Sequence, residues 1–221
     1  KDTWQELETN YFGSDTCRQI VKAIKEEITL KPLWRIIRDG IELKGKRIYL
    51  FTPRPRSNHS AEQQAAYKAN IFAYKKEFYF ADDTTEAIDL VLYLNGLPII
   101  TAELKHHGET GEASTYADAI TQYTERRHHV SKIFSLAFAP DTDEAKVATN
   151  PSDEKYFQPF NTGLENKENP EIPKGEYPIW HLYGQAFSPE YICDFLEYFL
   201  IYVVANAERK SSAFTIMPRF Q

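Results

Sequence analysis

Residues 87–105 read AIDLVLYLNGLPIITAELK, and this stretch decides how the chain folds. Two apolar runs, 87–94 and 97–104, are joined by Asn95-Gly96, a dipeptide that favours a tight hairpin turn. Both runs are apolar at almost every position, so neither has a face that belongs in water. The pattern therefore predicts two antiparallel central strands that are covered on both sides of their sheet.

Three charged residues, Asp89, Glu103 and Lys105, stand near the ends of these runs. Charged side chains are seldom buried unless they are paired or bind a metal. Glu103 and Lys105 share one face of a strand because side chains alternate with a period of two. If Asp89 lies beside Glu103, two carboxylates converge on one hard cation, and we expect Mg²⁺, with the backbone carbonyl of Leu104 as a further ligand. Such an ion would acidify a water molecule and neutralise phosphate charge. Lys105 would either orient that water or stabilise the transition state.

This arrangement depends on the register of the hairpin. With a strict two-residue loop, Asp89 would face Ala102, and the two carboxylates would point to opposite sides of the sheet. Asp89 faces Glu103 if the loop has three residues or if the hairpin contains one β-bulge. Pro98 cannot donate a ladder hydrogen bond, which favours an irregular start to the second strand. We therefore predict an irregular hairpin.

A helix is predicted from about Tyr116 to His129, and it carries Gln122 as a fourth catalytic candidate. The Gln122 amide would either reach back to the scissile phosphate or hold Lys105 by a hydrogen bond. Basic residues at the end of this helix and on an earlier strand are suited to contacts with DNA phosphates. These candidate DNA-binding residues are Arg126, Arg127, Lys75 and Lys76.

The rest of the chain mixes helical and strand patterns, which predicts an α/β fold with a mixed central sheet of about five strands flanked by helices. Helices are expected over residues 3–28, 33–38, 61–70 and 189–208, and further strands over 46–52, 70–80, 131–139, 146–149 and 156–160. Much of 140–178 is rich in Asp, Glu, Asn and Pro and is expected to be mainly loop.

Composition sets limits on partners and compartment. A net charge of −6 argues against strong autonomous DNA binding, although a nuclease needs only a local basic rim. The most apolar stretch, 191–205, carries Asp194 and Glu197 and is too short and too charged to span a bilayer, so we expect a cytoplasmic protein without membrane contact. Cys17 and Cys193 are not expected to form a disulfide.

Four segments resemble the N-terminal nuclease domain in the R (restriction) subunit of type I restriction-modification enzymes, whose motif is of the PD-(D/E)XK kind. They are IDLVLYLNGLPIITAELK (88–105), DAITQYTERR (118–127), YFQPFNTG (156–163) and MPRFQ (217–221). The first contains the family's NGLP turn, and the last is similar to the segment that opens the ATP-driven motor. The resemblance covers about residues 30–221, and NGLP…ELK is its most specific part.

The resemblance implies a restriction-endonuclease-like endonuclease domain over residues 1–215 and the start of a linker into a motor over 216–221. It implies a type I site-specific deoxyribonuclease that cuts unmodified foreign double-stranded DNA after motor-driven translocation, in a complex with modification and specificity subunits. It also assigns Gln122, Tyr123 and, more loosely, Arg127 to the family's helix motif. ATP would serve the full-length subunit and not this chain, which has no G-x-x-x-x-G-K-[ST] motif.

Two features depart from the family pattern. Glu77 stands where the family has a Gln, so that role is not carried over, and the family's first helix, with its own Glu, is not seen before Lys1. Two other interpretations stay open. One is a catalytically idle DNA-binding or docking module that couples the motor to its partner subunits. The other is a different nuclease of the same superfamily, although the segments PFNTG and MPRFQ argue against it.

Overall fold

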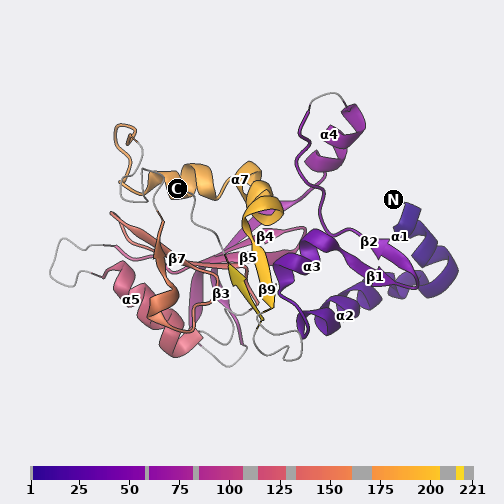
Figure 1. Ribbon diagram of the computed structural model, residues 1–221, viewed down its shortest axis with the longest axis horizontal. Helices are drawn as coiled ribbons and strands as arrows, with labels where there is room; N and C mark the ends of the chain where they lie inside the picture. The colour runs from indigo at the N-terminus through magenta and orange to yellow at the C-terminus, as the bar shows by residue number, and fades with distance from the viewer. Residues whose placement is uncertain are drawn as a thin grey trace. The chain divides into compact units, whose positions relative to one another are not determined.

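The computed structural model describes residues 2–57, 60–81, 85–106, 114–127, 133–160, 171–204 and 213–216. The chain divides into two compact units, residues 1–70 and residues 71–221. The first unit is mainly helical, and the second contains the large sheet (Figure 1).

The first unit begins with the predicted helical region and ends with the predicted short helix. Its elements are α1 (Asp2–Leu7), η1 (Glu8–Phe12), η2 (Gly13–Asp15), α2 (Thr16–Ile28), α3 (Leu33–Asp39), β1 (Ile41–Leu43), β2 (Lys46–Ile48) and α4 (Ala61–Lys68). Apolar residues of α2 and α3 form its core, among them Ile20, Ile24 and Trp34. The strand expected over 46–52 is wrong beyond Ile48, where the chain runs on through Pro53 and Pro55 without ladder hydrogen bonds.

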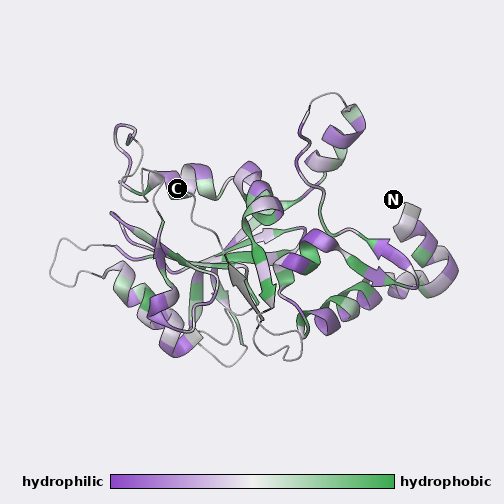
Figure 2. Ribbon diagram, viewed as in Figure 1, coloured by the Kyte–Doolittle hydropathy of each residue, from purple (hydrophilic) through white to green (hydrophobic). Residues whose placement is uncertain are grey.

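The second unit is built on a six-stranded sheet of order β3-β4-β5-β6-β7-β8, close to the five strands expected. The strands are β3 (Phe72–Tyr79), β4 (Ala87–Leu94), β5 (Leu97–Ala102), β6 (Leu136–Pro140), β7 (Ala145–Ala148) and β8 (Gln158–Pro159). Neighbours pair antiparallel except β5 and β6, which are parallel. The sheet is therefore mixed, as predicted, and its inner strands are strongly hydrophobic (Figure 2).

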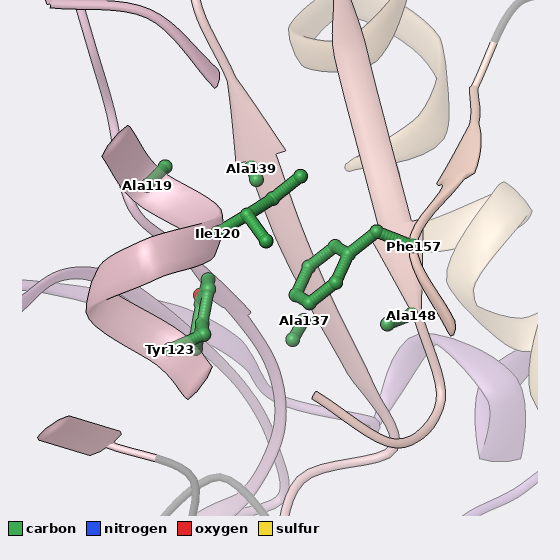
Figure 3. Packing of buried hydrophobic residues seen from close by; sticks show 7 residues of the cluster. All are labelled: Ala119, Ile120, Tyr123, Ala137, Ala139, Ala148 and Phe157. Carbon is green, nitrogen blue, oxygen red and sulfur yellow. The ribbon is translucent and has the colours of Figure 1, made fainter. Parts of the chain in front are cut away.

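Both faces of the sheet are covered, which confirms that the two apolar runs are central strands. On one face a helix, α5 (Tyr116–Thr121), continues into the wider π-helical turns of η3 (Gln122–Arg127). Ile120 and Tyr123 of this helix pack on small side chains of β6 and β7 and on Phe157 (Figure 3). On β6, Phe138 makes edge-to-face contacts with Phe160 and Phe187.

The C-terminal part differs from the single long helix expected over 189–208. Helical turns η6 (Leu182–Ala186), α7 (Pro189–Asp194) and η7 (Phe195–Phe199) are followed by a strand, β9 (Ile201–Val204), which pairs with β10 (Ala213–Ile216). The helix prediction is wrong beyond Phe199, because Ile201, Val203 and Val204 are β-branched residues that favour a strand. Residues 205–208, and residues 217–221 of the expected linker, lie outside the described residues.

Neither cysteine forms a disulfide, as expected from the sequence. Cys17 is exposed and Cys193 is buried. In the part of the chain that the structure describes, no helix combines the length and the apolar character needed to cross a bilayer.

Candidate active site

The hairpin of β4 and β5 has the irregular register that the two-carboxylate site requires. Leu94 pairs with Leu97 around the Asn95-Gly96 turn, but the register shifts by one residue between Leu92 and Tyr93, so that Leu90 pairs with Ala102. In this shifted register the next pair along the two strands is Asp89 with Glu103. The predicted irregularity is therefore confirmed, in its β-bulge form.

The backbone of residues 103–105 continues β5 in extended form past its last paired residue. The amides of Glu103 and Lys105 donate to Phe138 and Pro140 of β6, at 3.0 and 3.1 Å. The amide of Leu104 donates in the opposite direction, to Asp89 Oδ2 at 2.7 Å. This alternation is that of a strand, so the Glu103 and Lys105 side chains share one face. The Asp89 carboxylate lies directly beside the backbone that joins them.

Glu103 lies on the face of the sheet that the α5–η3 helix covers. Thr101, two residues earlier on that face, accepts a hydrogen bond of 2.9 Å from the Tyr123 hydroxyl of η3. Glu103 is 0% exposed, whereas Asp89 is half-buried. A buried carboxylate is costly when it is charged unless donors or a cation compensate it. The arrangement thus provides one sheltered and one accessible carboxylate on adjacent strands.

Lys105 is hydrogen-bonded to Gln122, the partner predicted for it from the sequence. Its Nζ donates to Gln122 Oε1 at 2.8 Å. This is the second of the two geometries predicted for Gln122, in which the amide fixes the lysine. Gln122 is itself positioned by α5, whose first turn is closed by a reciprocal capping box between Thr115 and Asp118.

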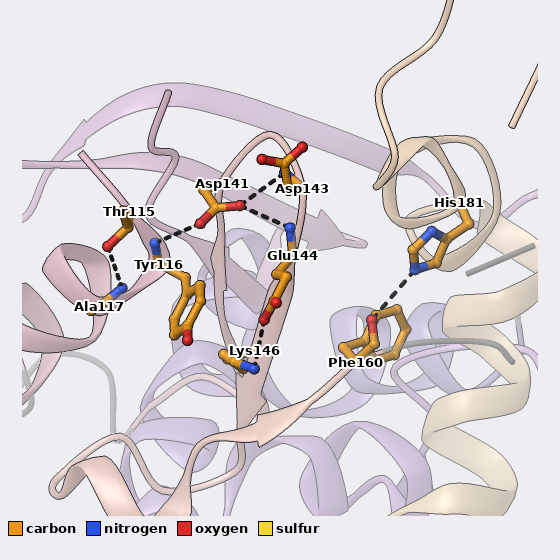
Figure 4. Close-up of polar contacts among 9 residues, drawn as sticks. All are labelled: Thr115, Tyr116, Ala117, Asp141, Asp143, Glu144, Lys146, Phe160 and His181. Carbon is orange, nitrogen blue, oxygen red and sulfur yellow. Dashed lines mark hydrogen bonds and ion pairs between the residues drawn. The ribbon is translucent and has the colours of Figure 1, made fainter. Parts of the chain in front are cut away.

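A buried carboxylate that the sequence interpretation missed anchors the same helix. Asp141 is 4% exposed and directly follows β6. Its Oδ2 accepts from the Tyr116 amide at 3.0 Å, and its Oδ1 accepts from the amides of Asp143 and Glu144 at 2.9 and 2.8 Å (Figure 4). Asp141 therefore ties the start of α5 to the β6–β7 turn, next to the Pro140 carbonyl that binds Lys105. The sequence signal was an Asp at a strand end before a turn, which is typical of an Asx-turn.

The candidate DNA-binding residues are not gathered on one face. Val91 is two residues from Asp89 on β4, so the two side chains lie on the same face of the sheet. Lys75 pairs with Val91 and therefore shares the face of the carboxylates. Lys76 alternates to the other face. Arg126 of η3 is exposed, and the side chain of Arg127 lies outside what the structure describes.

The edge strand β3 is irregular at the position beside Asp89. Lys76 pairs with Leu90 and Phe78 with Ile88, while Glu77 between them is unpaired in the ladder and has a positive φ of 50°. Few residues other than Gly, Asn or Asp adopt this conformation. Glu77 is exposed. Across the described residues, no three His, Cys, Asp or Glu side chains form a metal-binding cluster, so Asp89 and Glu103 would hold a cation with help from backbone or water oxygens.

Comparison with known proteins places this geometry in a family. The family model described as the type I restriction enzyme R protein N terminus matches residues 2–162, which include the hairpin, the helix with Gln122 and Asp141. A protein of Methanocaldococcus jannaschii, provisionally named as the MjaVIIIP endonuclease subunit of a type I restriction enzyme, is 29% identical over 157 residues. That alignment covers 68% of this chain and 14% of the relative, so the chain spans about a seventh of the relative's length.

The match also agrees with the architecture. The six-stranded mixed sheet flanked by helices is a restriction-endonuclease-like α/β fold, as the resemblance implied. Because the family model matches well over half of the residues, the chain belongs to the family of type I restriction enzyme R protein N-terminal domains.

Proposed function

We propose that this chain is a metal-dependent endonuclease domain that hydrolyses phosphodiester bonds of double-stranded DNA. The observation that carries the proposal is the row formed by Asp89 and Glu103 at the ends of two central strands, with Lys105 fixed beside it by Gln122. Carboxylate oxygens and a fixed ammonium group are the parts that metal-assisted phosphoryl chemistry needs.

The residues present fit a hard divalent cation. Asp89 and Glu103 offer oxygen donors from adjacent strands, and directly opposite residues have Cβ atoms about 5 Å apart, which is close enough to share an ion. Two carboxylates with water completing the shell are typical of Mg²⁺, and the Leu104 carbonyl is a further oxygen nearby. When bound, the cation would supply positive charge at the scissile phosphate and acidify a water molecule.

The chain's own cations would then act on the phosphate. The Lys105 ammonium, held at 2.8 Å by the Gln122 amide, keeps its charge in one place, so little reorganisation is needed when negative charge develops. The exposed Arg126 and the Lys75 side chain would contact neighbouring phosphates and orient the duplex.

The family suggests the larger context. We propose that the domain works within a type I restriction complex, cutting unmodified foreign DNA after an ATP-driven motor has translocated it, with modification and specificity subunits as partners. The support is the family match and the name of the M. jannaschii relative, most of which lies outside the aligned region.

Metal binding tests the site directly. We would titrate the full-length natural protein with Mn²⁺, a spectroscopic substitute for Mg²⁺, and measure bound ion by electron paramagnetic resonance. Glu103→Gln and Asp89→Asn should each weaken binding by at least tenfold, because each removes a charged oxygen donor. Glu125→Gln, an exposed carboxylate in η3, is the matched control and should bind as the wild type does. Equal Mn²⁺ affinity in all four proteins would refute the site.

DNA cleavage by the assembled complex tests the function. Glu103→Ala and Lys105→Ala should lower the cleavage rate by at least 100-fold, since metal and fixed-charge contributions are each worth several kcal/mol. ATP hydrolysis and translocation should continue at wild-type rates in both variants. Retained cutting by either variant would contradict the assignment.

The net charge of −6 favours one alternative, a catalytically idle docking module that couples the motor to its partners. In such a module, Glu103→Gln and Asp89→Asn would leave Mn²⁺ binding unchanged. Substitutions at Glu103 would affect assembly of the complex instead of DNA cleavage. The two experiments therefore separate the two functions.

A further inference from the structure

An aromatic cleft lies in the second unit, outside the region that the family model matches. It has a volume of about 320 Å³ and is lined by Glu176, Tyr177, Trp180, Tyr183 and Gly184. This is at the low end of the range for small-ligand sites, so the cleft has room for a single flat ring system. Tyr177 is 58% exposed and Tyr183 is 44% exposed, so their rings are accessible at the cleft.

The cleft has a fixed shape. A Cβ at Gly184 would lie 2.7 Å from Cζ3 of the Trp180 ring, so any other residue there would displace the indole. The Trp180 Nε1–H donates to the Glu171 carbonyl at 3.2 Å. This hydrogen bond satisfies the only polar atom of the indole and holds the ring in place. Partial burial of the Tyr183 side chain raises the pKa of its hydroxyl to about 12. A preformed aromatic site loses little entropy when a flat ligand enters.

One ring contact links the cleft to the segment that carries Lys105. The His106 ring meets the Tyr177 ring edge to face, with 6.4 Å between centroids and an interplanar angle of 88°. His106 directly follows Lys105, the lysine that is proposed to act beside the row of Asp89 and Glu103. The cleft therefore borders the end of the segment that carries Lys105, on the sheet face opposite Glu103, because Tyr183 contacts Phe187 and Phe187 contacts Phe138.

The charges of the cleft select a base over a phosphate. Among the described residues that line it, none is Lys or Arg, and Glu176 is an acidic lining residue. A carboxylate repels the phosphate backbone but accepts hydrogen bonds from the amino groups of adenine, cytosine and guanine. Aromatic rings in turn stack on the faces of unpaired bases.

We propose that the cleft lined by Tyr177, Trp180 and Tyr183 binds one unpaired nucleobase of the DNA that the active site engages, and that Glu176 favours bases that carry an amino group. This inference rests on the proposed nuclease function, because the active site is what brings DNA to the cleft. A base that has left its stack supplies the flat, exposed faces that such a cleft recognises.

Oligonucleotide binding tests the cleft without cleavage. We would measure fluorescence anisotropy of labelled single-stranded dA8, dC8 and dT8 with the full-length protein in EDTA. The wild type should bind dA8 and dC8 more tightly than dT8. Tyr183→Leu should weaken dA8 binding by about tenfold, as expected for the loss of one stacking partner. Tyr198→Leu, an exposed tyrosine of η7 outside the cleft, is the matched control and should bind normally.

Further variants keep the test decisive. If Tyr183→Leu fails to fold, Tyr177→Leu, whose ring is more exposed, should show the same tenfold loss. Glu176→Gln should remove the preference for dA8 and dC8 over dT8. Wild-type affinity in a folded Tyr183→Leu or Tyr177→Leu protein would overturn the proposal. Intact oligonucleotide binding with failed subunit assembly would likewise overturn it and identify a protein-docking cleft.

Oligonucleotide binding and DNA cleavage, measured together, separate this inference from the proposed function. Glu103→Gln, which removes the proposed catalytic carboxylate but leaves the cleft intact, and Tyr183→Leu are compared in both the anisotropy assay and the cleavage assay of the assembled complex. If the nuclease proposal fails while the cleft inference holds, Glu103→Gln will cut DNA normally and Tyr183→Leu will still lose dA8 binding. If the nuclease proposal holds while the cleft inference fails, Glu103→Gln will be inactive and Tyr183→Leu will bind and cut as the wild type does.

Discussion

Replacing Asp141 by Asn should loosen the start of α5 while preserving the shape of the side chain. The carboxylate accepts three backbone hydrogen bonds at 2.8–3.0 Å and is almost fully buried. Asn keeps one acceptor oxygen and places an NH2 group where the other oxygen stood. If the Asn oxygen keeps the hydrogen bonds from the amides of Asp143 and Glu144, the Asn NH2 group points at the Tyr116 N–H. Two donors then face each other. One charge-assisted bond is lost and a buried donor is left unsatisfied, which should cost about 2–4 kcal/mol.

Hydrogen–deuterium exchange measures this cost locally. A loss of about 2–4 kcal/mol from the opening free energy corresponds to roughly 30- to 800-fold faster exchange in peptides covering residues 114–121 and 141–148. Asp143→Asn, an exposed residue of the same turn, is the matched control and should change exchange little. Peptides from α2 in the first unit provide an internal reference. Exchange that accelerates less than threefold at Tyr116, or equally in both variants, would refute the anchoring role of Asp141.

Two other changes test the packing around the sheet. Tyr123→Phe removes the buried hydroxyl that donates to Thr101 and should lower the free energy of unfolding by about 1 kcal/mol in urea titrations. A double-mutant cycle with Thr101→Val should show coupling of similar size, and strict additivity would argue against the bond. Burial lowers the pKa of His181 despite its hydrogen bond to the Phe160 carbonyl, so the folded state favours the neutral ring. Stability from this residue should be complete above the unfolded pKa of about 6.5 and fall as the pH drops from there to the lowered folded pKa, by at most about 1.4 kcal/mol per pH unit. His181→Gln should remove this component, and identical pH profiles for both proteins would contradict it.

The hairpin and its bulge could be predicted because every constraint on them is local. Asn95-Gly96 sets the turn, and the apolar runs set which strands are central. The need for Asp89 to face Glu103 then leaves a single register with one extra residue, which the structure places near Pro98. The partnership of Lys105 with Gln122 followed from the same logic, because a helix covering that face brings an amide within reach of the lysine.

The missed features depend on contacts between segments distant in sequence. Asp141 binds Tyr116 across 25 residues, and no local pattern marks that pairing. The strand β9 was taken for the end of a helix because its apolar run directly follows a helical pattern; its β-branched residues favour a strand, and it pairs with β10. β1 was missed for a different reason: it has three residues, too few for an alternation to be seen, although its partner β2 lies within the strand predicted over 46–52.

Core packing and site geometry are linked on the face that carries Glu103. Ala137 and Ala148 are paired across β6 and β7, and with Ala139 they present a shallow surface to the α5–η3 helix. Small side chains let a helix approach a sheet closely, since the distance between layers is set by the side chains at the contact. That approach lets the Tyr123 hydroxyl reach Thr101 at 2.9 Å and the Gln122 amide reach Lys105 at 2.8 Å. The position of the Lys105 ammonium thus follows from the volume of the alanines beneath the helix as much as from the hairpin, so residues outside the candidate site help to set its geometry.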